Sequence, residues 1–194
     1  MAFLTKVPIM QTYYSSLEEI HKQTKQLDNE LCISCGESHL VSHGYIYKKG
    51  SAAAEPVPVG KRVICSKRYG RTGCGRTMQL YLDSRVRYLH YAGCCVVAFV
   101  CWLMAGITIS EAYQDVTGTK DPRNAYRWLN KLSARFSVYR SHVHKPRLDE
   151  TEDTPVRVVN PRRRLLASTF LALSDCFGHP LCERYQQSLQ TTFL

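Results

Sequence analysis

"CISCGE", residues 32–37, and "CSKRYGRTGCGR", residues 65–76, are two cysteine pairs in which the second cysteine of each pair precedes a glycine. Glycine tolerates the positive φ of a tight turn in which backbone N–H groups point at a thiolate sulfur. Two such turns flanked by strands indicate one tetrahedral site that joins the two stretches. The expected metal ligands are Cys32, Cys35, Cys65 and Cys74.

Zinc is the metal that this ligand set favours. Four thiolates complete a tetrahedral shell and leave no open position for water chemistry, so the expected Zn(2+) is structural. The second pair is more widely spaced than the usual two to four residues, so residues 66–72 are expected to loop out as a basic finger. His39 or His43 could replace one thiolate, although a surface position on a strand is the simpler interpretation of each.

Alternating residues around the cysteine pairs predict strands at 39–50, 59–65 and 77–83. So small a β unit could hardly bury a core without a metal. The expected fold class is α+β: a small zinc-ribbon β module, then a helical helix-turn-helix domain and a C-terminal helix. The expected boundaries are a helical lead-in at 1–29, the ribbon at 30–84, the helix-turn-helix at 85–144, a polar linker at 145–160 and a C-terminal helical segment, broken near Gly178, at 161–194.

The chain is strongly basic and rich in cysteine. Its 26 Lys and Arg against 16 Asp and Glu give a net charge of +10, which favours a polyanionic partner such as DNA, RNA or an acidic membrane surface. Nine unevenly spaced cysteines do not suit a secreted disulfide framework, and residues 1–16 lack the pattern of a signal peptide. The expected location is therefore cytoplasmic, where clustered cysteines usually bind metal.

Residues 92–109, "AGCCVVAFVCWLMAGITI", contain no charged residue and reach the lower length limit of a membrane span. A small single-span membrane protein is therefore an alternative from another functional class. The run is poor in Leu and Ile and contains two glycines, which favours a buried helix that runs into a turn, with no membrane partner. In such a helix Cys94, Cys95 and Cys101 would pack as small apolar side chains.

Glycines and capping residues divide the next segment into helices. Gly106 ends the first helix, Ser110 begins the second, and Gly118 ends the second. Asp121 as N-cap and Pro122 at the first helical position open a third. Two short helices joined by a small turn and followed by a longer basic helix form the outline of a helix-turn-helix.

The third helix separates an apolar face from a basic one. Its apolar residues recur at helical spacing: Ala125, Trp128, Leu129, Leu132 and Phe136. Arg can bond guanine bidentately and Asn can pair with adenine in the major groove. An ordinary amphipathic helix with a solvated face is the simpler alternative, but the helix pair and the ribbon before it favour DNA recognition. The predicted DNA contacts are Arg123, Asn124, Arg127, Asn130 and Lys131, with Arg68 and Arg71 of the finger.

"CISCG…HGYIYKKG…KRVIC…CGRTMQLYLD", followed by "AGITISEAYQDVTG…NAYRWLNKL", resembles the N-terminal part of bacterial insertion-sequence transposases. It is most similar to the small zinc-ribbon and helix-turn-helix protein encoded by the first frame of short insertion sequences. The resemblance covers roughly residues 30–140, and the long Cys65–Cys74 spacing departs from the family pattern. It implies binding to the ends of a mobile element, repression or assistance of transposition, and a transposase as a partner.

A catalytic role is not expected. A transposase core holds two metal ions with three carboxylates on an RNase H-like sheet, which needs far more than the roughly 50 residues after the helix-turn-helix. The expected function is non-catalytic, zinc-dependent binding of double-stranded DNA in transposition or in regulation of a mobile element. A free-standing transcription regulator is the alternative. The C-terminal helix is expected to pack on the body or to form a homodimer seam through Leu165, Leu166, Phe170 and Leu173.

Overall fold

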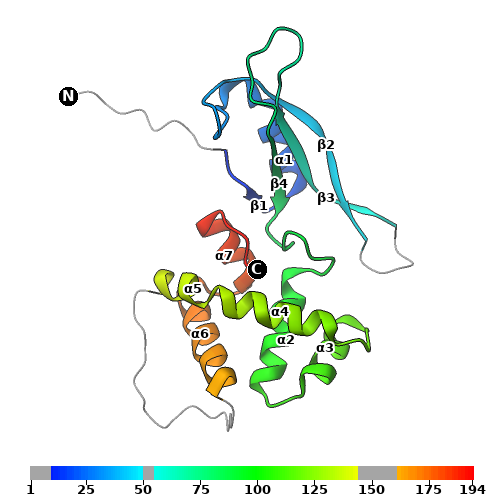
Figure 1. Ribbon diagram of the computed structural model, residues 1–194, viewed down its shortest axis with the longest axis vertical. Helices are drawn as coiled ribbons and strands as arrows, with labels where there is room; N and C mark the ends of the chain where they lie inside the picture. Colours follow the sequence, from blue (N-terminus) through cyan, green and yellow to red (C-terminus); the bar gives the residue numbers. More distant parts are fainter. Residues whose placement is uncertain (1–9, 50–54, 144–160) are drawn as a thin grey trace, which may run out of the picture.

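The computed structural model describes residues 10–49, 55–143 and 161–194, with side chains from residue 163 onward in the last range. Its elements separate into two lobes that follow one another along the long axis of the molecule (Figure 1). One lobe is a sheet with helix α1, and the other contains helices α2–α7. The fold is therefore mixed α and β, as the sequence predicts. The linker predicted at 145–160 lies outside the described residues.

The sheet has four strands in the order β1-β4-β3-β2. Strands β2, β3 and β4 form an antiparallel meander, and the two-residue β1 pairs in parallel with β4. All three strands predicted from residue alternation are confirmed. The bounds are Tyr13–Tyr14 for β1, Leu40–Lys48 for β2, Val57–Cys65 for β3 and Thr77–Leu82 for β4.

The N-terminal helix packs on this sheet. Helix α1 (Leu17–Lys25) begins after Ser16, whose hydroxyl accepts from the Glu19 N–H as an N-cap. Ile20 of α1 is fully buried, and the 3-10 turn Leu27–Asn29 follows. The sheet lobe thus has a small cluster of buried residues that includes two of the cysteines: Met10, Tyr14, Ile20, Leu27, Cys32, Leu40, Val63, Cys65 and Leu80. A second, smaller cluster lies on the strands: Tyr13, Ile46, Val59 and Tyr81.

The first three helices of the other lobe are α2 (Gly93–Met104), α3 (Ile109–Thr117) and α4 (Arg123–Ala134). Gly118 ends α3 in the left-handed conformation, as predicted. The predicted start of α3 at Ser110 is corrected by the structure. Thr108 is the N-cap, because its hydroxyl accepts from the Glu111 N–H at 3.3 Å while the Glu111 carboxylate accepts from the Thr108 N–H at 3.4 Å.

Helices α5 (Phe136–His142), α6 (Pro161–Phe177) and α7 (Leu181–Leu189) complete this lobe. The break between α6 and α7 falls at the predicted glycine. Aromatic rings make up much of the core, with Tyr113 and Trp128 at 5.2 Å and Phe99 and Trp128 at 5.6 Å between ring centroids. Helices α6 and α7 share this core through Leu166, Phe170, Leu173, Leu181 and Tyr185.

The apolar run at 92–109 forms a buried helix that ends at a turn, as predicted. The buried positions of α2 recur at helical spacing: Val96, Phe99, Val100 and Leu103. Cys94 and Cys101 lie on the opposite side of the helix and are exposed, so the prediction that they pack in the core is wrong. Cys95 is half-buried against the core.

Within the described ranges, no single helix combines the length and the apolar character needed to cross a membrane. Helices α6 and α7 meet the length and composition criteria only as a pair, from Arg163 onward, and the chain bends by 67° between them.

Helix α7 and its C-cap residue Gln190 connect the two lobes through glutamine side chains. The Gln190 Oε1 atom accepts from the N–H groups of Thr12 and Tyr13 at 2.7 and 2.9 Å. The Gln186 amide, fully buried, donates to the carbonyl oxygens of Asp83 and Arg85 in the segment between β4 and α2. The C-terminal helix therefore helps to set the position of the sheet relative to the helices.

Candidate metal centre and nucleic-acid interface

The two cysteine pairs meet at one end of the sheet. Cys32 and Cys35 lie between the 3-10 turn and β2, Cys65 ends β3, and Cys74 precedes β4. The Cys32 and Cys74 sulfurs are 3.7 Å apart, and the Cys35 and Cys65 sulfurs are 3.6 Å apart. All four sulfurs lie within 4.8 Å of one another, so the cluster could hold a metal ion.

The backbone forms the same turn around each pair. The Cys32 N–H donates to the Glu37 carbonyl and the Gly36 N–H donates back to the Cys32 carbonyl, at 2.9 and 2.8 Å. The second pair repeats both bonds at the same lengths: Cys65 N–H to the Arg76 carbonyl, and Gly75 N–H to the Cys65 carbonyl. Each glycine has the positive φ expected from the sequence, +77° at Gly36 and +74° at Gly75.

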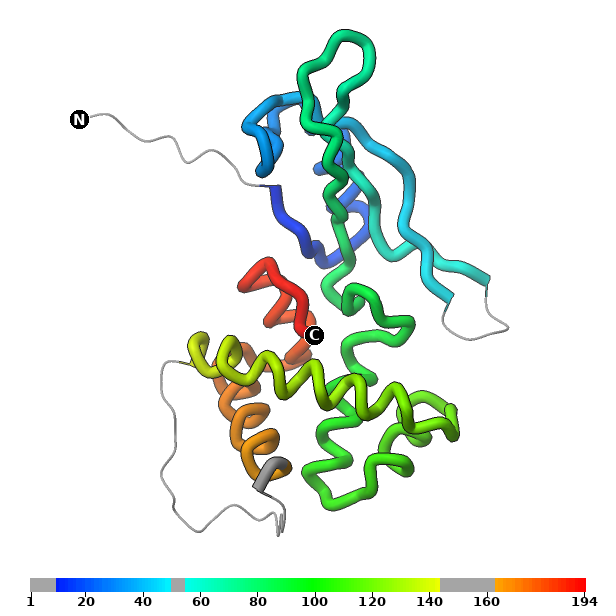
Figure 2. The backbone as a smooth tube through the Cα atoms, viewed as in Figure 1, coloured from blue at the N-terminus to red at the C-terminus, as the bar shows by residue number. Residues whose placement is uncertain are grey.

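The long insert between Cys65 and Cys74 closes on itself, so it leaves this turn intact. The Gly73 N–H donates to the Ser66 carbonyl at 3.1 Å, so the last residue of the insert lies beside the first. A Cβ atom at Gly73 would lie 2.2 Å from the Ser66 carbonyl oxygen and 2.8 Å from the Cys65 sulfur, so only glycine fits there. The intervening residues project as the basic finger that the sequence predicts (Figure 2).

Backbone N–H groups point at the sulfurs. Cys65 accepts from the Cys74 N–H at 3.2 Å, and Cys32 accepts from the Ser34 N–H at 3.4 Å. Burial raises the pKa of the Cys65 thiol to about 12. Burial also disfavours the Cys32 thiolate, but the N–H groups of Ser34 and Cys35 outweigh it and lower the pKa of that thiol to about 7. Of these two buried thiols, Cys32 is therefore the more readily ionised.

The histidine alternatives are not brought into the cluster. The His39 ring lies 3.9 Å from the Glu37 carboxylate, and His43 is exposed on β2. Among the described His, Cys, Asp and Glu residues, the four cysteines are the one group close enough to share an ion.

Helix α4 presents the predicted polar face to solvent. Ala125, Trp128 and Leu132 are buried against the helical core, whereas the predicted contacts are all exposed: Arg123, Asn124, Arg127, Asn130 and Lys131. In Figure 1, α4 crosses the front of the helical lobe, so its outer face is uncovered. This arrangement can present cationic and amide groups to a polyanion.

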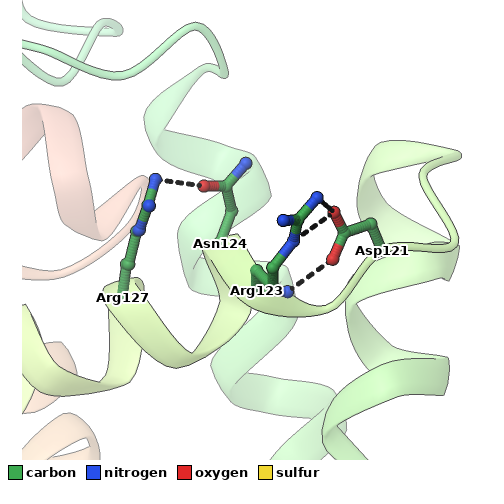
Figure 3. A network of polar contacts seen from close by, with 4 residues as sticks. All are labelled: Asp121, Arg123, Asn124 and Arg127. Atoms are coloured by element: carbon green, nitrogen blue, oxygen red, sulfur yellow. Dashed lines mark hydrogen bonds and ion pairs between the residues drawn. The ribbon is translucent and has the colours of Figure 1, made fainter.

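Two of these side chains are already oriented by neighbours (Figure 3). Arg127 donates to the Asn124 amide oxygen at 3.2 Å, and the two lie side by side on the helix. Arg123 makes an ion pair of 2.6 Å with Asp121, whose carboxylate also accepts from the Arg123 N–H. The Asp121 carboxylate thus bonds the first N–H of α4, but the prediction of Asp121 as N-cap and Pro122 as first helical residue is wrong: Pro122 is the N-cap and the helix begins at Arg123.

The finger residues Arg68 and Arg71 are also exposed, but they belong to the other lobe and to the far end of the sheet (Figure 2). The structure therefore gathers the predicted DNA contacts into two separate groups. Sequence reasoning overlooked Tyr69, which is 96% exposed at the tip of the finger. The one indication in the sequence was an aromatic residue between two arginines.

Comparison with protein-family models, with curated proteins and with solved structures finds no match for this chain.

Proposed function

We propose that the protein is a non-catalytic DNA-binding protein whose sheet lobe is held by one structural zinc ion. The observation that carries this proposal is the convergence of four thiols beside a sheet lobe with a very small core, together with a separate helix whose exposed face is cationic. The zinc site, the DNA contact and the biological role are supported by different features.

The spacing of the sulfurs suits zinc. A tetrahedron with a metal–sulfur distance of about 2.3 Å has edges of about 3.8 Å between sulfurs. Two sulfur pairs of the cluster are 3.7 and 3.6 Å apart, and all four sulfurs lie within 4.8 Å of one another. Cys32 and Cys65 are buried in the lobe's own core, so an ion bound there would tie the turn before β2 to the end of β3. Zinc would thereby contribute directly to folding.

The features of α4 support DNA as the partner. Its exposed face has three cationic side chains and two Asn side chains, the groups that bond phosphates, guanine and adenine. Helix α3, which precedes α4 in the chain, contacts both α2 and α4. A recognition helix in a helix-turn-helix likewise follows a helix that packs against it. The net charge of +10 agrees in sign with a polyanionic partner. Double-stranded DNA is therefore the proposed ligand.

The proposed role is accessory to transposition or regulatory for a mobile element, on the strength of the resemblance between residues 30 and 140. A transposase and a second copy of the chain are the further partners that this role would involve. Footprinting on the ends of the element and on its promoter distinguishes this role from that of a free-standing transcription regulator, which would protect the promoter alone.

The DNA contact is tested by Arg127→Ala in a mobility-shift titration. We expect binding to weaken by about 1–3 kcal/mol, because a bidentate base contact is worth that much. Arg184→Ala removes the same charge from an exposed position on α7 and is the matched control. Equal affinities of wild type and Arg127→Ala would show that α4 does not read DNA.

A further inference from the structure

The finger, residues 66–72, is anchored at its base. Cys65 and Cys74, at its two ends, both belong to the sulfur cluster. The Ser66 N–H donates to the His39 carbonyl at 2.7 Å, and the Ser66 hydroxyl accepts from the Arg68 N–H at 3.2 Å. Because both ends are anchored, the tip has a defined position relative to the sheet.

The tip is a tight turn with an unfavourable residue in it. The Arg71 N–H donates to the Arg68 carbonyl at 3.3 Å, and the two central residues, Tyr69 and Gly70, have φ values of +59° and +77°. Positive φ at both central positions is the pattern of a type I′ turn, which favours Asn-Gly, Asp-Gly or Gly-Gly. A tyrosine in that conformation is strained, and such strain persists mainly at functional sites.

The side chain of Tyr69 is as unusual as its backbone. The residue is 96% exposed, so its side chain contributes little to the stability of the sheet lobe. The finger around it contains three cationic residues and no acidic one: Lys67, Arg68 and Arg71. An exposed ring between two guanidinium groups matches the chemistry of a nucleic acid, since rings stack on bases while arginines hold phosphates.

We propose that Tyr69 stacks on an unpaired or unstacked base while Arg68 and Arg71 bind the flanking phosphates. A base inside an intact duplex offers no free face to the ring, so the preferred ligand is DNA with a locally opened or bulged step. This inference rests on the proposed DNA-binding function and adds to it a second contact of different chemistry. Helix α4 would read paired DNA, and the finger would hold DNA whose stacking is interrupted.

Tyr69→Asn separates the function of the ring from the shape of the turn. Asn-Gly is the favoured pair for a type I′ turn, so this variant should keep or raise the melting temperature and keep its zinc content. Binding is measured by fluorescence anisotropy with two short duplexes, one fully paired and one carrying a single unpaired base. Wild type should prefer the bulged duplex, and Tyr69→Asn should lose about 5- to 150-fold in affinity for it.

Two further variants complete the test. Tyr69→Phe keeps the ring and should keep the preference for the bulged duplex, whereas Tyr47→Asn changes an exposed tyrosine on β2, outside the finger, and should have no effect. A Tyr69→Asn protein that binds the bulged duplex as tightly as wild type, or that loses affinity equally for both duplexes, overturns the inference. Wild type that binds neither duplex instead overturns the proposed function.

Discussion

Replacing Cys35 by Ser should unfold the sheet lobe and leave the helical lobe folded. Cys35 is exposed, so the substitution removes no packing from the core and changes one ligand atom of the cluster. A structural zinc site contributes on the order of 10 kcal/mol or more, which is comparable to the whole stability of a small domain. The buried residues of the sheet lobe form two small clusters, one of nine residues that includes two cysteines of the metal cluster and one of four, so they cannot replace that contribution.

The helical lobe has an independent and larger core, with nineteen buried residues drawn from α2–α7 and the segments beside them. Its helices should therefore persist in the variant. Hydrogen exchange should show loss of protection for the amides of Val63 and Leu80 and retained protection for that of Leu132, together with loss of zinc by elemental analysis. Cys101→Ser, at an exposed cysteine outside the cluster, is the control and should match wild type. Retention of one zinc per chain and of protected Val63 in Cys35→Ser would refute the reasoning.

Three further changes test other parts of the structure. Gly73→Ala should weaken zinc binding in a competitive chelator titration, because the new Cβ would overlap the Ser66 carbonyl oxygen; unchanged affinity would contradict the close approach. Trp128→Ala should lower the free energy of unfolding by about 3–5 kcal/mol in denaturant titrations, since it removes a buried ring that contacts three others. Zinc affinity should fall with decreasing pH, because the Cys65 thiol, whose pKa is raised to about 12, must lose its proton to bind, and should fall more steeply below about 7, where the Cys32 thiol is protonated as well; a flat profile from pH 8 to about 5 would disagree with thiolate ligation.

The cysteine cluster and most of the secondary structure could be predicted from local sequence. A Cys-Gly step specifies a turn by its own φ preference, so both halves of the cluster were recognisable without knowledge of the fold. Residue alternation likewise predicted the strands, and the apolar spacing of α4 predicted which of its side chains would be buried. The start of α3 was misplaced by two residues because Thr108, like Ser110, is a good N-cap, and the reciprocal bonds with Glu111 favour Thr108.

The contacts between distant segments depended on tertiary structure. Residue types alone could not show that the widely spaced pair Cys65 and Cys74 has the same backbone hydrogen bonds as the first pair. Those bonds form only because Gly73 closely approaches Ser66. Nor could they place Gln186 on carbonyls about a hundred residues away, or turn Cys101 toward solvent while its helix is buried on the other side. The local conformation that a residue prefers depends on its own type and on a few neighbours in sequence, so it can be predicted from the sequence. Which distant backbone it meets depends on how whole elements pack, and that is decided only when the chain folds.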